Sequence, residues 1–256
     1  MVFYLIAKFY IHSNYSIFGA PFSLGAPFFM LKQFNMKTAL LLSGQLREWK
    51  IPYQSLWENF IKDYQPDIFI SYHYDTDTEI NEDLIKEVWN PKSFSIQKYP
   101  PQFYFDLQIA KTYPTSPESN PESSFKMFYG ILNANELKSN YEQLNGFKYD
   151  RVVRCRFDTE FFNPIKLREH SDMWIPIGGD HRGGYNDTFV YGTSEAIDYY
   201  CSAYPKLNDY LNEGAVFHPE SLMKYHLDKG PYSIWRTDIP MRLRNIKLDE
   251  IDYRQK

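Results

Sequence analysis

Short apolar runs alternate with amphipathic helical stretches from residue 37 to residue 158, and this alternation restricts the fold more than any other feature of the sequence. Runs rich in aliphatic and aromatic residues predict strands, and apolar residues at helical spacing predict helices between them. The expected strands cover residues 37–42, 67–72, 94–98 and 149–155, and the expected helices cover residues 52–64, 79–89 and 124–145. Strands and helices that alternate in this way form parallel β-α-β units, so we expect an α/β fold.

The fourth expected strand carries two arginines and leads into an acid. Residues 149–162 read YDRVVRCRFDTEFF, where Arg154 and Arg156 are two positions apart and Asp158 follows the strand. Side chains two positions apart in a strand share one face of the sheet. Ligands of open α/β sheets bind at the carboxyl ends of the strands, where Asp158 is expected. Two interpretations stay open: an internal Arg–Asp ion pair, or an anion site with a metal-binding carboxylate.

A Ser-Gly turn follows the first expected strand, in the sequence Ser43-Gly44-Gln45-Leu46-Arg47. Such a turn lets the backbone approach a ligand closely and direct its amides at a phosphate or a base. Arg47 adds a possible charge-assisted contact. The alternative is an ordinary strand-to-helix turn with a solvated arginine. The sequence has neither GxGxxG nor GxxxxGK[ST] at this place, so a dinucleotide site and a P-loop are not favoured.

The second half of the chain departs from the alternation and contains a glycine-rich polar loop. After a strand expected over 173–177, residues 178–187 read GGDHRGGYND, which predicts either a site loop or a solvated surface loop. Asp180 lies within this loop, and Asp187 precedes a short strand expected over 188–191. Helices are expected over 194–211 and from Pro219, directly after His218, and a last strand over 232–236.

Composition narrows the partners and the compartment. The 256 residues carry a net charge of −4, and we therefore expect no nucleic-acid partner, which would require a basic surface. Cys155 and Cys201 are the only cysteines and lack the spacing of a metal site. A reducing compartment, and hence a cytoplasmic location, is expected.

Residues 1–35 differ from the rest because they are aromatic, lack acids and contain Gly-Ala-Pro twice. Polar residues interrupt the apolar runs, so none reaches the roughly 20 residues that span a bilayer. Three interpretations are open: an anchor that gives peripheral membrane association, an ordered extension packed on the domain, or a start codon assigned too early. The last is favoured, with the domain beginning near Met36.

Five segments occur in an order that resembles a known family. They are SGQLR after the first strand, KMFYGILNANEL, YDRVVRCRFD, the glycine-rich loop with Asn186-Asp187 before a strand, and HPESLMKYHL. Together they resemble the small GT-A-like glycosyltransferases of viral and bacterial surface-polysaccharide biosynthesis, whose first strand carries an SGQxR signature. The resemblance covers residues from about 37 to 236. It implies a GT-A-like, Rossmann-like fold, with a mixed, mainly parallel sheet flanked by helices, and a single catalytic domain over residues 36–256.

The same resemblance implies an enzyme that moves a sugar from a nucleotide-diphosphate donor to a glycan or another hydroxyl acceptor. Many relatives bind Mn²⁺ or Mg²⁺ through a DxD motif, and the matching triplet here is Arg156-Phe157-Asp158. Arginine replaces the first acid, so a fixed cation is available to neutralise the diphosphate in place of a metal. If a metal is bound, the expected ligands are Asp158 and His218, with Glu160 as a further acid.

The remaining roles follow from the chemistry of glycosyl transfer. The expected donor contacts are Ser43, Gly44, Gln45, Arg47, Arg154 and Arg156. Inversion requires a carboxylate near the acceptor hydroxyl, for which Asp187 is the first candidate and Asp180 the second. With retention, Asp187 would instead bind the acceptor or the donor sugar, and Glu220 is an alternative to His218 in completing the site. Two other functions stay open: a nucleotidyltransferase on a similar sheet, and a catalytically silent carbohydrate-binding module.

Overall fold

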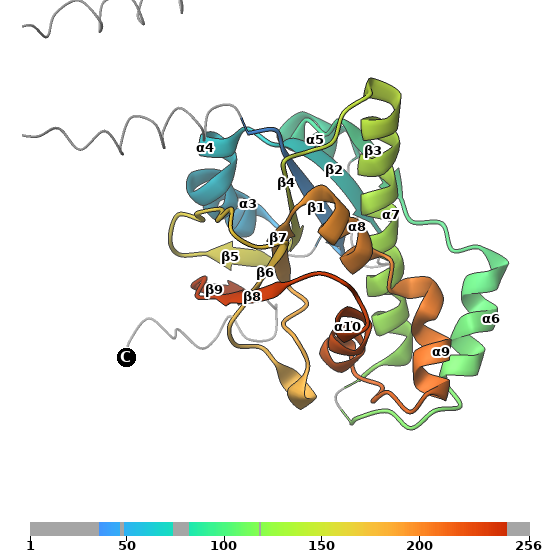
Figure 1. Ribbon diagram of the computed structural model, residues 1–256. Coiled ribbons are helices and arrows are strands. Elements are labelled where there is room, and N and C mark those ends of the chain that lie inside the picture. Colours follow the sequence, from blue (N-terminus) through green and yellow to red (C-terminus); the bar gives the residue numbers. More distant parts are fainter. Residues whose placement is uncertain (1–35, 47–48, 74–81, 118, 245–256) are drawn as a thin grey trace, which may run out of the picture. The chain divides into compact units, whose positions relative to one another are not determined.

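The computed structural model describes residues 36–46, 49–73, 82–117 and 119–244, and a seven-stranded mixed sheet lies at its centre (Figure 1). The strand order is β3-β2-β1-β4-β7-β6-β8. The bounds are β1 Thr38–Gly44, β2 Asp67–Tyr72, β3 Ser93–Ile96, β4 Arg151–Arg156, β6 Met173–Pro176, β7 Phe189–Gly192 and β8 Ile234–Thr237. Strand β7 alone runs against the others, because it pairs antiparallel with β4 and β6 while every other pair is parallel. The expected α/β class is confirmed, and the architecture is consistent with a Rossmann-like fold.

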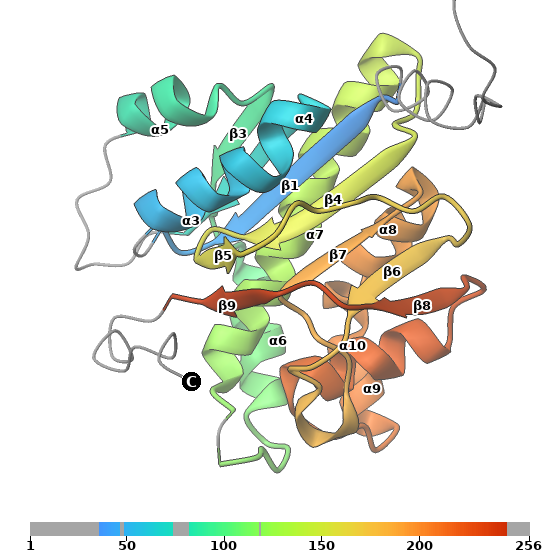
Figure 2. The same ribbon diagram turned by 90° about the vertical axis from the view of Figure 1, so that its left-hand side faces the viewer.

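Helices cover both faces of the sheet (Figures 1 and 2). One face packs against α6 Pro101–Ala110, α7 Pro121–Asn145, α8 Ser194–Cys201, α9 Leu207–Asn212 and α10 Pro219–Asp228. The other face packs against α3 Lys50–Leu56, the π-helical η1 Trp57–Ile61, α4 Lys62–Tyr64 and α5 Glu82–Trp89. Two short 3₁₀ segments, η2 His181–Gly183 and η3 Tyr204–Lys206, lie in the connections. A sheet covered on both sides explains why its central strands are apolar throughout.

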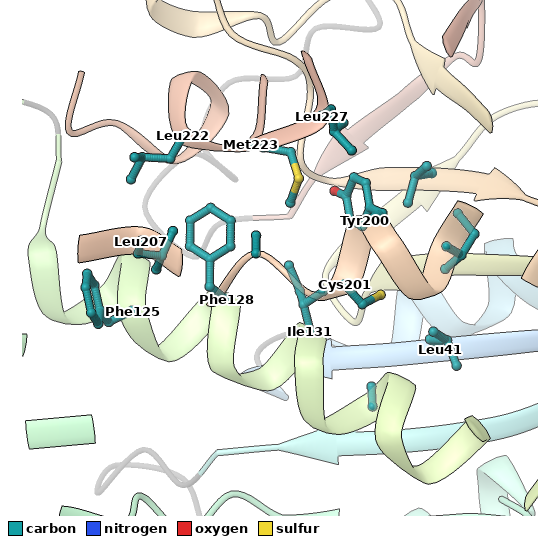
Figure 3. Packing of buried hydrophobic residues seen from close by; sticks show 14 of the residues in the cluster. Leu41, Phe125, Phe128, Ile131, Tyr200, Cys201, Leu207, Leu222, Met223 and Leu227 are labelled. Atoms are coloured by element: carbon teal, nitrogen blue, oxygen red, sulfur yellow. The ribbon is translucent and has the colours of Figure 1, made fainter. Parts of the chain in front are cut away.

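Strand β1 divides its side chains between the two cores. Leu41 is completely buried on the face covered by α7 and α8, and Leu42 is completely buried on the opposite face. This division follows from the twofold alternation of side chains along a strand. Figure 3 shows the first core, in which Phe128 and Ile131 of α7 are directed toward the helices of the second half of the chain. Burial of each such side chain stabilises the fold by about 1.5–3 kcal/mol.

Helix α7 begins and ends at residues that favour those positions. The Asn120 side chain accepts a hydrogen bond from the backbone N–H of Ser123 at 3.1 Å, and Pro121 occupies the first turn. Gly146 ends the helix with a φ of 66°, a left-handed conformation that glycine adopts without strain. The predicted helix over 124–145 is confirmed at its end, but its start was placed three residues too late. The Asn-Pro pair lies in a Pro- and Ser-rich stretch, residues 112–124, whose composition is typical of a loop.

Several predicted boundaries and elements need correction. Helix α6 and the short strands β5 Thr159–Phe161 and β9 Met241–Leu243 were not predicted, and β5 and β9 pair with each other as a separate antiparallel sheet. The helix expected over 194–211 is divided into α8, η3 and α9, with Pro205 at the break. Proline lacks the N–H that a continuous helix requires, which explains the division. The strand expected over 188–191 is present as β7, one residue further along.

Both cysteines are free thiols and buried. Cys155 is completely buried in β4, where it packs as a small apolar residue. No helix among the described residues is long and apolar enough to cross a membrane. Residues 1–35, to which we assigned an anchor, an extension or a misassigned start, lie outside the described residues.

Candidate functional site

A cavity of about 1120 Å³ lies at the carboxyl edge of the sheet. Its wall includes residues at the ends of β1, β2, β4 and β6, the residues that precede β7, and the first turns of α7 and α10. Open α/β sheets bind their ligands at this edge. Side chains that are more than a hundred positions apart in the sequence, such as Ser43 and Arg154, therefore lie together in the cavity wall.

The Ser-Gly turn forms one side of this cavity. Ser43, Gly44 and Gln45 all line it, as the sequence predicted for a ligand site. Gly44 has a φ of 120°, which L side chains rarely adopt, so the turn depends on glycine. The parallel register places Ser43 beside Arg156 of β4. Arg47, the other predicted contact of this turn, lies outside the described residues.

Arg154 is a completely buried cation in the cavity wall. Its Nη1 donates to the backbone carbonyl of Asp187, and its Nη2 donates to Ser43 Oγ at 3.4 Å. Its Nε–H is buried without a hydrogen-bond partner. Among the described residues no carboxylate lies within ion-pair distance of this guanidinium group. A buried charge without a counter-charge is costly, so the position favours a site for an anion.

Arg156 and Asp158 form a bidentate ion pair at the end of β4. Arg156 Nε and Nη2 donate to the two carboxylate oxygens of Asp158 at 2.9 and 2.7 Å. Burial lowers the pKa of Arg156, but the adjacent Asp158 charge and these hydrogen bonds outweigh it, so the pKa lies above its ordinary value. The Arg156 side chain is 34% exposed and lines the cavity. The internal Arg–Asp ion pair is therefore present, and both of its members line the cavity. The anion site with a metal-binding carboxylate stays a prediction.

Asp187 lines the cavity between the glycine-rich loop and β7. In the part of the chain that the structure describes, its carboxylate forms neither a hydrogen bond nor an ion pair. Its position is fixed by the backbone, since its carbonyl accepts from Arg154 and the flanking Thr188 N–H donates to Asn186 Oδ1 at 2.8 Å. A rigidly held carboxylate without a partner in a cavity is suited to accept a proton from a bound hydroxyl.

Glu220 and His218 form a second titratable group on the wall, at the start of α10. His218 Nδ1 lies 2.8 Å from Glu220 Oε2, and both side chains are largely buried. Burial and the nearby Asp187 carboxylate raise the pKa of Glu220 to about 7. The Tyr185 N–H donates to the Glu220 carbonyl at 3.1 Å, which ties the glycine-rich loop to the helix. The structure thus places Glu220, which was only an alternative in the sequence analysis, beside the main base candidate.

Asp180 does not line the cavity. Its two carboxylate oxygens accept from Arg236 Nη2 at 2.7 and 2.9 Å, and Oδ1 also accepts from the Asn186 N–H at 3.1 Å. Arg236 belongs to β8, so these bonds attach the glycine-rich loop to the sheet. The geometry gives Asp180 a role in loop support and leaves Asp187 as the better placed base.

The carboxylates predicted as metal ligands are already paired with cations. Both oxygens of Asp158 accept from Arg156, and Glu160 Oε2 accepts from Arg242 and Arg244 at 2.7 and 2.9 Å. The described residues contain no group of three or more His, Cys, Asp or Glu side chains arranged to hold a metal ion. The divalent cation at Asp158 and His218 stays a prediction, and this arrangement does not fit it well.

Part of the wall was not predicted from the sequence. The beginning of α7 contributes Asn120, Ser123, Lys126 and Met127, and the segment around β9 contributes Ile239 and Arg242. The Asn-Pro capping signal could have identified the start of α7. Strand β9 has only three residues, too few for a periodic pattern, and the sequence offered no sign of its place in the site.

No family model matches the chain, and no curated protein matches it either. The functional conclusions below therefore depend on the fold and on the cavity.

Proposed function

We propose that the protein is a glycosyltransferase that transfers a sugar from a nucleoside-diphosphate sugar to a hydroxyl group of a glycan or another acceptor. One observation carries the proposal: the cavity combines a buried guanidinium group without a counter-charge, Arg154, with an unpaired carboxylate, Asp187. Glycosyl transfer with inversion uses both features. A cation stabilises the departing diphosphate, and a carboxylate accepts the proton of the attacking hydroxyl.

Several features support a donor diphosphate on the Arg154 side. Arg154 and Arg156 share one face of β4, and Ser43 lies next to them in the register. The Ser43-Gly44-Gln45 turn lies in the same wall, where the absence of a Cβ on Gly44 lets a phosphate or a base approach the backbone. Guanidinium groups suit phosphate oxygens because their N–H groups form a planar fork.

The acceptor is expected on the side of Asp187 and Glu220. For inversion, the Asp187 carboxylate accepts the proton of the acceptor hydroxyl as the new glycosidic bond forms. Glu220, whose pKa is raised to about 7, is partly protonated at neutral pH and is able to donate a hydrogen bond to a sugar hydroxyl. With retention of configuration, Asp187 would contact one of the two sugars instead.

The mixed, mainly parallel sheet and the order of the motifs support the narrower GT-A-like assignment. The SGQLR segment begins with the last two residues of β1, the Arg156-Phe157-Asp158 triplet begins with the last residue of β4, and the HPESL segment begins α10. All three reach the same cavity. In GT-A glycosyltransferases that use Mn²⁺ or Mg²⁺, the metal supplies positive charge to the diphosphate. Here no step is assigned to a metal, because the candidate carboxylate ligands Asp158 and Glu160 are paired with arginines.

Incubation with a panel of UDP-, GDP-, ADP- and CMP-sugars tests the proposal. We expect thermal stabilisation by one sugar nucleotide and its slow hydrolysis in the absence of an acceptor. The Asp187→Asn variant should bind that donor within threefold of wild type and lose about 100-fold or more in hydrolysis or transfer. Stabilisation by free glycans alone would indicate a binding module, and release of pyrophosphate from a nucleoside triphosphate and a sugar phosphate would indicate a nucleotidyltransferase.

A further inference from the structure

We infer that the protein binds the diphosphate of its donor with guanidinium groups and without a divalent cation, and that Asp158 is a positioning residue for Arg156. The inference rests on the proposed function, because it concerns the same donor site. It changes the role of Asp158, which the sequence analysis placed at the metal.

The geometry of the Arg156–Asp158 pair supports this role. A guanidinium group has five N–H bonds, and Asp158 accepts two of them, one on Nε and one on Nη2. The other three, five less two, are left for a ligand. Asp158 holds one edge of the fork, so the opposite edge has a fixed direction before any ligand arrives. A preorganised fork binds phosphate oxygens at a lower entropic cost than a mobile side chain does.

Arg154 supplies the second positive group. It is buried at the same face of β4, two residues earlier, and its Nε–H has no partner. Its hydrogen bonds go to two uncharged acceptors, the Asp187 carbonyl and Ser43 Oγ. The Asp158 charge offsets Arg156, whereas the Arg154 charge is not offset by any carboxylate at ion-pair distance in the described residues. An anion in the cavity would provide the missing charge.

The two acids that would otherwise bind a cation, Asp158 in the cavity wall and Glu160 outside it, are both held by arginines. Glu160 lies on β5 and is paired with Arg242 and Arg244 from the segment of β9. A metal at Asp158 would have to displace Arg156 from both carboxylate oxygens and to lie beside its positive charge. Such a displacement costs the bidentate pair and adds repulsion, so the cation is disfavoured relative to the arginine.

Calorimetric titration of the full-length protein with UDP, GDP, ADP and CDP, each in EDTA and again in Mn²⁺, tests the inference. We expect at least one diphosphate to bind with dissociation constants that agree within threefold in the two buffers. Binding that is tenfold or more tighter in Mn²⁺ would overturn the inference and leave the proposed function standing. If none of the four diphosphates bound in either buffer, the result would contradict the proposed function, and the inference with it.

Two variants separate positioning from metal ligation. Asp158→Asn should weaken diphosphate binding about tenfold in EDTA, because Arg156 loses its bidentate partner; a metal ligand would leave binding in EDTA unchanged. Arg156→Asp restores an acidic triplet, and we expect it to bind poorly in EDTA and to regain affinity in Mn²⁺. Glu213→Gln removes an exposed carboxylate paired with Lys229 and serves as the charge-matched control, with wild-type binding in both buffers. Wild-type circular dichroism in each variant excludes a loss of fold.

Discussion

Gly184 lies against the backbone of Glu220 so closely that a Cβ at residue 184 would be 2.1 Å from the Glu220 carbonyl carbon. The φ of Gly184 is −83°, which any residue can adopt, so the requirement for glycine here is one of space. The contact places the glycine-rich loop directly on the first turn of α10. The loop and the helix therefore fix the position of Glu220 in the cavity together.

The first prediction concerns this contact. Gly184→Ala forces the loop and α10 apart and displaces Glu220, so we expect a loss of about 1–3 kcal/mol in the free energy of unfolding together with slower sugar transfer or donor hydrolysis. Gly214→Ala is the matched control, because Gly214 has a φ of 93°, open space around its Cα and no place in the cavity wall. It should lower stability without slowing the reaction of the folded protein. Urea denaturation and activity assays measure both effects, and equal reaction rates in all three proteins would contradict the prediction.

A second prediction concerns a buried ionic network between helices α7 and α8, away from the Ser43-Gly44 turn at the end of β1. Lys138 of α7 is completely buried, and its Nζ contacts Glu142 at 3.1 Å, Asp198 at 2.7 Å and Ser194 at 2.7 Å. Lys138→Met leaves two carboxylates with only the exposed Lys148 as a cation. We expect destabilisation by about 3 kcal/mol, since one partner of a buried pair is removed.

The control for this network is Lys224→Met, which breaks an exposed pair with Asp228 one turn away. Exposed pairs contribute about 0–1 kcal/mol, so this variant should unfold close to the wild-type urea concentration. Similar unfolding midpoints for the two lysine variants would show that the buried network contributes no more than a surface pair.

His226 provides a prediction on acid stability. It is buried between Tyr210 Oη, 2.8 Å from Nδ1, and the Tyr199 carbonyl, 2.7 Å from Nε2, and burial lowers its pKa from 6.5 to about 4. The unfolded chain binds a proton on His226 at higher pH than the folded chain does. The neutral, buried His226 therefore contributes its full stability above pH 6.5, and this stability is lost as the pH falls toward 4. Over this range the free energy of unfolding should fall by roughly 3 kcal/mol because of His226.

His226→Gln removes the titrating group and with it this dependence of stability on pH, although we expect the variant to be less stable than wild type at pH 7. We expect its free energy of unfolding to fall less than that of wild type between pH 6.5 and 4. The exposed His170→Gln variant should follow the wild-type curve. If the free energy of unfolding fell equally with pH in His226→Gln and in wild type, the assignment of acid sensitivity to His226 would be contradicted.

Glu220 should act in the opposite direction. Its pKa is raised from 4.5 to about 7, so the folded chain binds a proton that the unfolded chain has released. Stability from this group is present below pH 4.5 and is lost as the pH rises through 7. Glu220→Gln should therefore gain stability relative to wild type from pH 5 to pH 8, by about 2–3 kcal/mol in total. The exposed Glu195→Gln variant is the control, and a constant difference between Glu220→Gln and wild type across this range would exclude the raised pKa.

Much of the fold could be predicted because strong local signals determine it. β2 lies where it was expected, and Gly146 ends α7 as its position predicted. Elements without such signals were not found. Helix α6 is rich in aromatic residues without a clear apolar face, and β5 and β9 are stabilised by their pairing with each other rather than by any pattern of their own.

The site was predicted in part for a similar reason. Ser43 lies at the carboxyl end of β1 and Asp158 follows β4, and both could be placed because the carboxyl ends of neighbouring parallel strands meet at one edge. The partners of charged side chains could not be predicted in the same way. The sequence left open whether Asp158 is paired with arginine or binds a metal. Nothing in the sequence around Asp180 indicated its hydrogen bond to Arg236, which is 56 residues away. Such pairings depend on packing between segments that are distant in the chain.

Arg154 offers the most direct test of the central claim, that this cavity binds a nucleoside diphosphate. Arg154→Met keeps a long side chain in the core and removes the positive charge, while Arg168→Met removes an exposed arginine that stacks on Trp174 outside the cavity. The measurement is calorimetric titration of wild type and both variants with UDP, GDP, ADP and CDP. We predict that one diphosphate binds wild type and Arg168→Met equally and binds Arg154→Met about 10- to 100-fold more weakly, because a charge-assisted contact is lost. Equal affinity in all three folded proteins, or no binding of any diphosphate to wild type, would contradict the claim.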